Sequence, residues 1–189
     1  GIIGSIDTYD GFEDLESTNT TPEAPDLWRH LANARDAHLS AMVMEVSSQA
    51  LKYDRTLGVE LGVACFLNIG TDHISPAEHP SFEDYFSSKL RIFSQARRSV
   101  VNLGTAHLGR VLDAATRAAG GLGAPLTVSA AGPAPVECGS CDMVEPDVWA
   151  TQVEPHGSSI TFVAHTPSWE APVTVNFPGL FNVENALVA

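Results

Sequence analysis

Residues 41–48 have the sequence AMVMEVSS, and this stretch decides the fold class. Its first four residues and Val46 are apolar, and such a nearly continuous run is typical of a strand buried on both faces of a sheet. Glu45 interrupts the run, and the pair Ser47-Ser48 ends it. Strands of this kind belong mainly to parallel sheets covered by helices. The stretch therefore predicts an α/β fold.

Strand and helix patterns alternate on both sides of this stretch. Residues 2–6 form a short apolar run, and residues 21–33 predict a helix with Pro22 at its first helical position. Residues 62–68 and 99–103 are further apolar runs downstream. This alternation predicts a mainly parallel sheet flanked by helices, built as a single domain.

Two more helices are predicted in the middle of the chain. Ser81 begins a helix in which Asp84 holds the capping-box position, and residues 107–119 form the next. The first of these helices carries an apolar stripe, made of Phe82, Tyr85, Phe86, Leu90 and Phe93. Lys89 lies close to this stripe. Residues 126–129 predict one more short strand.

The last third of the sequence changes character. Residues 148–153, 159–163 and 173–177 predict three short strands, with a turn at residues 155–157. We expect them to be antiparallel and to lie at the edge of the sheet. Residues 181–189 predict a final helix whose apolar face has nothing after it in the sequence, which suggests a fragment of a longer protein.

Composition excludes several classes of function. Ten Lys and Arg against 23 Asp and Glu give a net charge of -13, which would repel a nucleic-acid backbone. No apolar run approaches the length of a membrane span, and the first residues lack the charged flank of a signal peptide. The sequence thus predicts a cytoplasmic protein without nucleic-acid or membrane partners.

The cysteines carry little functional information. Cys65, Cys138 and Cys141 are too few for a disulfide framework, and their odd number agrees with a reducing compartment. Cys138 and Cys141 have the spacing of half a zinc site, but no second pair of ligands lies nearby in the sequence. Their role stays open.

Unusual polar residues lie at the ends of the apolar runs. Glu45, Asn68, Asp72 and His73 are at or just after the carboxyl ends of predicted strands, where ligands bind in open α/β sheets. A carboxylate at the end of a buried strand is costly to ionise unless it is paired or binds a cation. For Glu45, cation binding and capping of backbone N–H groups are equally good interpretations.

Lys89 and the histidines allow competing interpretations. A lysine on the inner side of a helix has a lowered pKa, and its neutral amine could react with carbon dioxide, although a snorkelling side chain is the commoner outcome. Glu45, His73 and His79 could alternatively form the zinc site of a metal-dependent hydrolase. The irregular spacing of these three residues makes that interpretation weak.

Four motifs follow one another along the chain: NTTPE at 19–23, MEVSSQAL at 44–51 with Arg55, NIGTDH at 68–73 and YFSSK at 85–89. A closing stretch, GLFNVENA, follows at 179–186. In this order they resemble the central, ATP-binding domain of the Mur ligases, and the likeness covers nearly the whole chain. Four separated motifs in one order are more specific than any one of them.

This resemblance implies roles for individual residues. Glu45 and His73 would bind Mg²⁺, and Lys89 would be carbamylated to support the cation. The UDP-muramoyl-dipeptide substrate would contact Thr20, Thr21, Ser47 and Arg55. The adenine of ATP would contact Asn182 and Asn185.

The resemblance also implies an activity, ATP-dependent amide formation through an acyl phosphate in peptidoglycan precursor synthesis. Residues 1–189 would be a fragment of the central domain. The glycine-rich phosphate loop is expected before Gly1, and the N-terminal and C-terminal domains would lie outside the chain. We therefore expect the fragment alone to be inactive, and the amino acid to be chosen by the C-terminal domain.

Two departures from the family pattern leave another function open. The segment ISPAEHP at 74–80 replaces the family's usual LDYHG, and Asn102-Leu103-Gly104-Thr105 lacks an acidic pair common at that position. The same fold could therefore act on another substrate. It could also be a non-catalytic module that binds nucleotide sugars or docks a partner.

Overall fold

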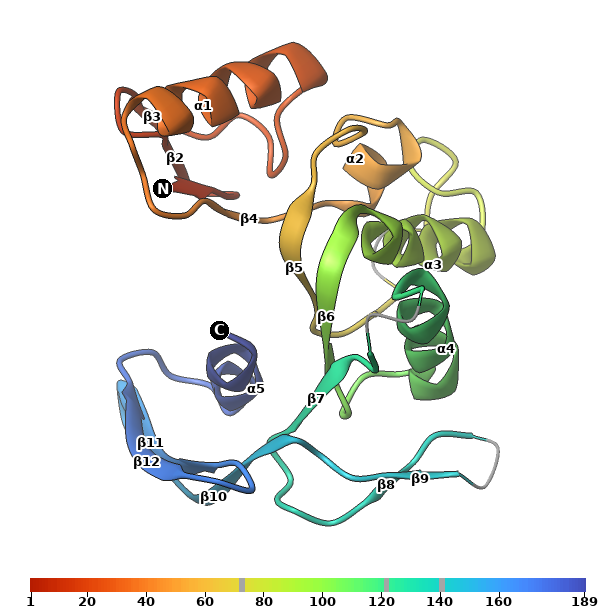
Figure 1. Ribbon diagram of the computed structural model, residues 1–189, viewed down its shortest axis with the longest axis vertical. Coiled ribbons are helices and arrows are strands. Elements are labelled where there is room, and N and C mark those ends of the chain that lie inside the picture. Colours follow the sequence, from red (N-terminus) through yellow and green to blue (C-terminus); the bar gives the residue numbers. More distant parts are fainter. Residues whose placement is uncertain (72–73, 121–122, 140–141) are drawn as a thin grey trace. The chain divides into compact units, whose positions relative to one another are not determined.

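The chain forms two compact units in a computed structural model that describes residues 1–71, 74–120, 123–139 and 142–189 (Figure 1). Unit 1 contains residues 1–59 and 71–95, and unit 2 contains residues 60–70 and 96–189. His73 and Cys141 lie outside the described residues. None of the helices in the described parts is long and apolar enough to cross a membrane.

Unit 1 contains a four-stranded sheet with the order β3-β2-β1-β4. Its strands are β1 (Ile2–Ile3), β2 (Asp7–Tyr9), β3 (Asp14–Glu16) and β4 (Val43–Met44). β1 pairs parallel with β4, whereas β1, β2 and β3 pair antiparallel. The parallel pair places the residues after Ile3 and after Met44 at the same edge of the sheet. The antiparallel strands 7–16 were not predicted from the sequence.

Helix α1 (Ala24–Asp36) begins later than the sequence indicated. Glu23 is its N-cap and accepts no capping hydrogen bond with its side chain, while Pro25 occupies the first turn. The predicted start at Pro22 is wrong because Thr21 does not cap the helix. Its hydroxyl is instead used in a tertiary contact, described below.

Two short helices complete unit 1. Ser47 caps α2 (Ser48–Lys52) by accepting a hydrogen bond from the N–H of Ala50 at 3.1 Å. Ser81 caps α3 (Phe82–Leu90) by accepting one from the N–H of Asp84 at 3.2 Å, as the sequence predicts. α3 continues into the 3-10 turn η1 (Arg91–Gln95), and it packs against α2. The predicted stripe forms this core, with Tyr85, Phe86 and Phe93 buried.

Unit 2 contains a six-stranded mixed sheet with the order β12-β11-β10-β7-β6-β5. Its strands are β5 (Leu61–Phe66), β6 (Ala96–Asn102), β7 (Leu126–Ser129), β10 (Val148–His156), β11 (Ser159–His165) and β12 (Glu170–Val175). β5, β6, β7 and β10 are parallel, and β10, β11 and β12 are antiparallel. The α/β fold with antiparallel strands at the C-terminal end is thus confirmed. The turn follows His156, so Pro155 belongs to β10.

Helices α4 (Leu108–Ala118) and α5 (Phe181–Val188) belong to this unit (Figure 1). Val183 of α5 is buried in an apolar cluster with residues of β10 and β11, including Ile160 and Phe162. In the sequence between β7 and β10, β8 (Val136–Glu137) and β9 (Met143–Val144) pair antiparallel as a separate two-stranded sheet. The apolar face predicted for the last helix is therefore covered in part by the antiparallel strands.

Two strands are less buried than their sequences indicate. Val43 is 68% exposed in β4, and Val63 is 54% exposed in β5. Glu45, which directly follows β4, is exposed. The prediction of a strand buried on both faces at residues 41–46 is therefore wrong, and the carboxylate of Glu45 keeps contact with solvent.

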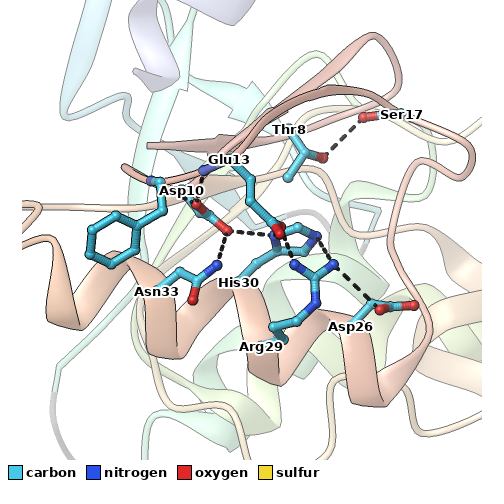
Figure 2. A network of polar contacts seen from close by, with 9 residues as sticks. Thr8, Asp10, Glu13, Ser17, Asp26, Arg29, His30 and Asn33 are labelled. Carbon is cyan, nitrogen blue, oxygen red and sulfur yellow. Dashed lines mark hydrogen bonds and ion pairs between the residues drawn. The ribbon is translucent and has the colours of Figure 1, made fainter.

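The carboxylate of Asp10 joins the turn between β2 and β3 to α1 (Figure 2). Asp10 is fully buried, and its Oδ1 accepts hydrogen bonds from the N–H groups of Phe12 at 3.0 Å and Glu13 at 2.8 Å. Its Oδ2 accepts one from the amide of Asn33 at 2.8 Å and lies 2.7 Å from Nδ1 of His30. A single side chain thus shapes the turn and holds it on the helix.

These donors determine the charge state of Asp10. Burial by itself would raise the pKa of the carboxyl group, but the donors from Glu13, His30, Asn33 and Phe12 outweigh it and hold the pKa far below its usual range. The folded state therefore gains stability from ionised Asp10. That contribution is complete above the usual aspartate pKa of about 4 and is lost only as the pH falls through the lower folded value.

We predict that Asp10→Asn loosens the hairpin of β2 and β3. Loss of charged acceptors for several donors costs about 1–3 kcal/mol, so the amides of residues 10–16 should exchange with deuterium roughly tenfold faster or more. The ratio of variant to wild-type exchange should stay constant between neutral and mildly acidic pH, because Asp10 remains ionised there. A ratio that falls steadily over that range would contradict the assigned charge state.

Candidate functional site

The hydroxyl of Thr21 connects the two motifs at the edge of the unit 1 sheet. Thr21 is 1% exposed, and its Oγ1 donates to the carbonyl of Glu45 at 2.9 Å. The same oxygen accepts a hydrogen bond from the N–H of Ser47 at 2.9 Å. These two backbone groups lie on either side of Val46, so one side chain provides hydrogen bonds to the backbone between β4 and α2. Residues 24 positions apart or more in the sequence are thereby placed at one site.

The carboxylate of Glu45 is held from one side by Ser5. Its Oε2 accepts hydrogen bonds from the N–H of Ser5 at 2.9 Å and from the Ser5 hydroxyl. That hydroxyl also lies 3.3 Å from the hydroxyl of Thr20. Because both contacts use Oε2, Oε1 is not needed for them. An exposed carboxylate oriented in this way suits a hard divalent cation, which prefers oxygen ligands.

Arg55 extends this group of residues. It lies 2.7 Å from Glu23 in an ion pair, and it donates to the carbonyl of Thr21 at 3.3 Å. Its Nε is buried and has no hydrogen-bond partner among the residues that the structure describes. The structure therefore brings together Thr20, Thr21, Glu45, Ser47 and Arg55, all within unit 1.

Lys89 lies on α3 of the same unit. Its Nζ lies 5.3 Å from the centroid of the Tyr85 ring, which is buried. Removal of the ammonium from water lowers the pKa of Lys89, in the direction that the sequence analysis expects. A lower pKa increases the share of neutral amine, which is the form that reacts with carbon dioxide.

The structure describes one of the two histidines of the alternative zinc site. His73 lies outside the described residues. His79 is fully buried, with Nδ1 2.6 Å from Asp84 and Nε2 2.9 Å from Ser48. Both ring nitrogens are engaged by protein groups, so the weak alternative interpretation of His79 as a zinc ligand is wrong.

In unit 2, polar side chains gather at the carboxyl ends of β5 and β6. Asn102 is 1% exposed; its amide donates to the carbonyl of Leu67 at 3.0 Å and to Glu184 at 2.9 Å. Its Oδ1 accepts a hydrogen bond from the N–H of Gly104 at 3.0 Å. A Cβ at position 104 would come within 3.1 Å of the Glu184 carboxylate, so this close approach favours glycine. Asn102 thus ties two strand ends to α5.

The asparagine pair predicted to contact adenine lies on α5. The amide of Asn185 donates to Oδ1 of Asn182 at 3.1 Å, and the amide of Asn182 donates to the carbonyl of Pro178 at 2.7 Å. Asn185 is exposed. The two side chains are therefore held side by side at the start of the helix.

Among the described residues, Asp10, Glu13 and His30 have the spacing of a metal site. Their lone pairs are already used, however. Four donors occupy the oxygens of Asp10, and the guanidinium of Arg29 forms an ion pair with Glu13 (Figure 2). A cation would have to displace a positively charged side chain. We therefore assign a structural role to this cluster.

Comparison with protein families gives a match along the whole sequence. The family described as the Mur ligase middle domain matches residues 1–189. The chain belongs to the Mur ligase family. The resemblance expected from the sequence is thus confirmed.

Curated Mur ligases are similar to this chain over half of it or more. UDP-N-acetylmuramyl-tripeptide synthetase of Bifidobacterium longum is 46% identical over 107 residues, which cover 56% of this chain and 21% of that protein. UDP-N-acetylmuramoyl-L-alanyl-D-glutamate--2,6-diaminopimelate ligase of Clostridium botulinum is 34% identical over 187 residues, or 99% of this chain and 35% of that protein. The chain thus spans about a fifth to a third of these Mur ligases.

A solved Mur ligase structure has the same fold. A UDP-N-acetylmuramoyl-L-alanyl-D-glutamate--2,6-diaminopimelate ligase aligns with a TM-score of 0.71 and 22% identity, covering 98% of this chain and 36% of that one. The likeness supports the α/β architecture of the Mur ligase middle domain.

Three residues of these sites were not predicted from the sequence. Ser5 follows the apolar run of β1, and the parallel pairing of Ile3 with Met44 brings it to Glu45. A polar residue after a strand was the available signal, but the pairing of these two strands was not known. Asn102 and Glu184 are 82 residues apart and meet only through the packing of α5.

We predict that Thr21→Val destabilises the Mur ligase domain by about 1–3 kcal/mol, because the carbonyl of Glu45 and the N–H of Ser47 lose a buried partner. The matched control is Thr21→Ser, which keeps the hydroxyl and removes a methyl group. Urea unfolding of the full-length natural protein measures both variants. Equal losses in the two variants would show that packing, and not the hydrogen bonds, holds this edge together.

Proposed function

We propose that the protein containing this chain is an ATP-dependent ligase that joins an amino acid to UDP-N-acetylmuramoyl-dipeptide. The proposal is supported above all by the two hydrogen bonds that the Thr21 hydroxyl forms with the backbone on either side of Val46. They hold the Thr20-Thr21 motif against the segment of Glu45 and Ser47, so residues assigned to substrate and to cation are neighbours. The names of the similar ligases supply the substrate class.

On the substrate side, Thr20, Ser47 and Arg55 offer hydroxyl and guanidinium groups. The proposed UDP-muramoyl-dipeptide is rich in carboxylate and phosphate oxygens, which such donors recognise. The buried Nε of Arg55 supports this assignment, because an unpaired donor costs stability unless a ligand uses it. Thr21 is buried and contributes by positioning its neighbours.

On the cation side, Glu45, His73 and a carbamate on Lys89 would hold Mg²⁺. When bound, the ion would neutralise charge on the terminal phosphate of ATP. The geometry around Glu45 fits this role, because Ser5 fixes one carboxylate oxygen and leaves the side chain exposed to solvent. Carbamylation would replace the ammonium of Lys89 by an anion, which can support a divalent cation.

On the nucleotide side, Asn182 and Asn185 would contact the adenine of ATP. Their amides are held next to each other, and amide groups can both donate to and accept from a base. The hydrogen bond from the Asn102 amide to Glu184 holds the same helix, α5, to the end of β6. Unit 2 therefore contributes the proposed nucleotide contacts.

The proposed reaction has two steps. An oxygen of the substrate carboxylate attacks the γ-phosphorus of ATP, ADP leaves, and an acyl phosphate forms. The amino group of the incoming amino acid then attacks the acyl carbon, phosphate leaves, and the nitrogen loses a proton. The groups described above act by orientation and by charge stabilisation.

We predict that Glu45→Gln lowers ligase turnover of the full-length natural protein by about 100-fold or more, because one cation ligand and its charge are lost. ATP consumption with UDP-muramoyl-dipeptide and an amino acid measures the effect. Glu60→Gln is the matched control, since Glu60 is an exposed carboxylate paired with Arg97. The control should keep nearly full activity.

Two outcomes would contradict the proposed function. Wild-type protein that binds the nucleotide sugar tightly but turns over with no amino acid would favour a binding or docking module. Equal activities of Glu45→Gln and Glu60→Gln would remove Glu45 from the cation site.

We predict a carbamate on Lys89 and none on Lys52. Lys89 has a lowered pKa, whereas the Nζ of Lys52 is engaged by the carboxylate of Asp84 at 2.7 Å and by the carbonyl of Glu78 at 3.0 Å. With ¹³C-labelled bicarbonate, the full-length protein should give a carbamate resonance that rises as the pH increases through the Lys89 pKa. The resonance should vanish in Lys89→Gln and persist in Lys52→Gln. A signal that survives Lys89→Gln would contradict the assignment.

A further inference from the structure

A buried polar network connects α2, α3 and the loop before α3 in unit 1. The Nδ1 of His79 lies 2.6 Å from Oδ2 of Asp84, and its Nε2 lies 2.9 Å from the hydroxyl of Ser48. The same Asp84 oxygen forms an ion pair with Nζ of Lys52 at 2.7 Å. Because a carboxylate only accepts hydrogen bonds, Nδ1 of His79 donates, and the orientation of the ring is determined.

The loop that ends at His79 is closed upon itself. Ile74 pairs with His79 as an isolated β-bridge, and the N–H of Ser75 donates to the carbonyl of His79 at 3.0 Å. The N–H of Glu78 donates back to Ser75, and the carbonyl of Glu78 accepts from Lys52 at 3.0 Å. The loop is therefore a compact turn fastened at its base to α2.

The order Ser48, His79 and Asp84 is that of a hydrolytic triad, but its burial argues against nucleophilic catalysis. His79 is fully buried and Ser48 is 5% exposed. A nucleophile must reach a substrate carbonyl, and this hydroxyl is packed between two helices. The network is therefore suited to hold segments in place.

The network also reaches Lys89 through an aromatic ring. The ring centroids of His79 and Tyr85 are 5.2 Å apart, and Nζ of Lys89 lies 5.3 Å from the Tyr85 centroid. Tyr85 is 3% exposed, so its ring cannot shift without moving its neighbours. His79 thus packs on the residue that supports the Lys89 amine.

We propose that His79 is a positioning residue for the cation site, and this inference rests on the proposed function. Two of the segments with a proposed ligand contact its ring. Ser48 follows Glu45 by three residues and contacts Nε2 of His79, whereas Tyr85 packs on the His79 ring and contacts Nζ of Lys89. One imidazole therefore fixes the spacing of α2 and α3, two segments that are distant in the sequence.

Mn²⁺ binding by the full-length natural protein, measured by electron paramagnetic resonance, tests this inference without requiring turnover. His79→Ala removes both polar contacts and the ring, so the dissociation constant for Mn²⁺ should rise by about tenfold, the lower end of the effects of supporting residues. His79→Asn keeps a donor near the position of Nδ1 and should restore part of the affinity. Ser48→Ala removes only the Nε2 contact and should give a smaller rise; it also serves if His79→Ala does not fold.

His165→Ala is the matched control for loss of stability. His165 lies in β11 of unit 2, where it contacts the Thr151 hydroxyl at 2.7 Å and stacks on Trp149. This variant should lower the melting temperature and leave the dissociation constant for Mn²⁺ unchanged. If the His79 and Ser48 variants likewise lose only stability, the positioning role of His79 is overturned.

The outcomes separate this inference from the proposed function. Wild-type protein that binds Mn²⁺ but never consumes ATP would overturn the ligase reaction, while the shifts in the variants would still support the positioning role. Wild-type protein that binds no Mn²⁺ would overturn both. An active wild-type enzyme whose His79 variants bind Mn²⁺ normally would overturn the positioning role alone.

Discussion

A single buried hydroxyl holds the candidate site of unit 1 together. Thr21 donates to the carbonyl of Glu45 and accepts from the N–H of Ser47, so it closes the gap where the chain passes from β4 to α2. Without it, two backbone groups would lose their partner in a partly buried contact, which costs stability. The exposed Glu45 carboxylate and the Ser47 cap depend on this connection. The motif residues are thus structurally coupled before any ligand binds.

Unit 2 uses the same principle with an amide in place of a hydroxyl. Asn102 contacts the end of β5, the turn after β6 and Glu184 of α5. Parallel strands end at one edge, where their last carbonyl and N–H groups are left unpaired. Side chains with several donors and acceptors satisfy them. In both units, the residues that stabilise these strand ends are neighbours of those that we propose contact ligands.

The pKa values of three charged side chains are lowered for two different reasons. Asp10 is surrounded by donors, and its lowered pKa reflects a structural anchor between a turn and α1. Asp84 is likewise engaged by Lys52 and then His79, which lower the pKa of its carboxyl group. Lys89 differs, because desolvation lowers its pKa while its amine lies near an aromatic ring. Hydrogen-bond donors thus stabilise the charged form of the two carboxylates, whereas burial disfavours the charged form of the amine.

The sequence by itself determined the α/β class, the strands 126–129 and 148–153, the Ser81 cap of α3 and the order of the Mur ligase motifs. These features follow from local periodicity, cap residues and short motifs, which need no knowledge of distant contacts. Only the tertiary structure decided that Thr21 contacts the backbone of Glu45 and Ser47 and does not cap a helix. It also decided that both ring nitrogens of His79 contact protein groups. The reason is physical: a side-chain hydroxyl or imidazole can satisfy many partners, and the fold decides which of them is within reach.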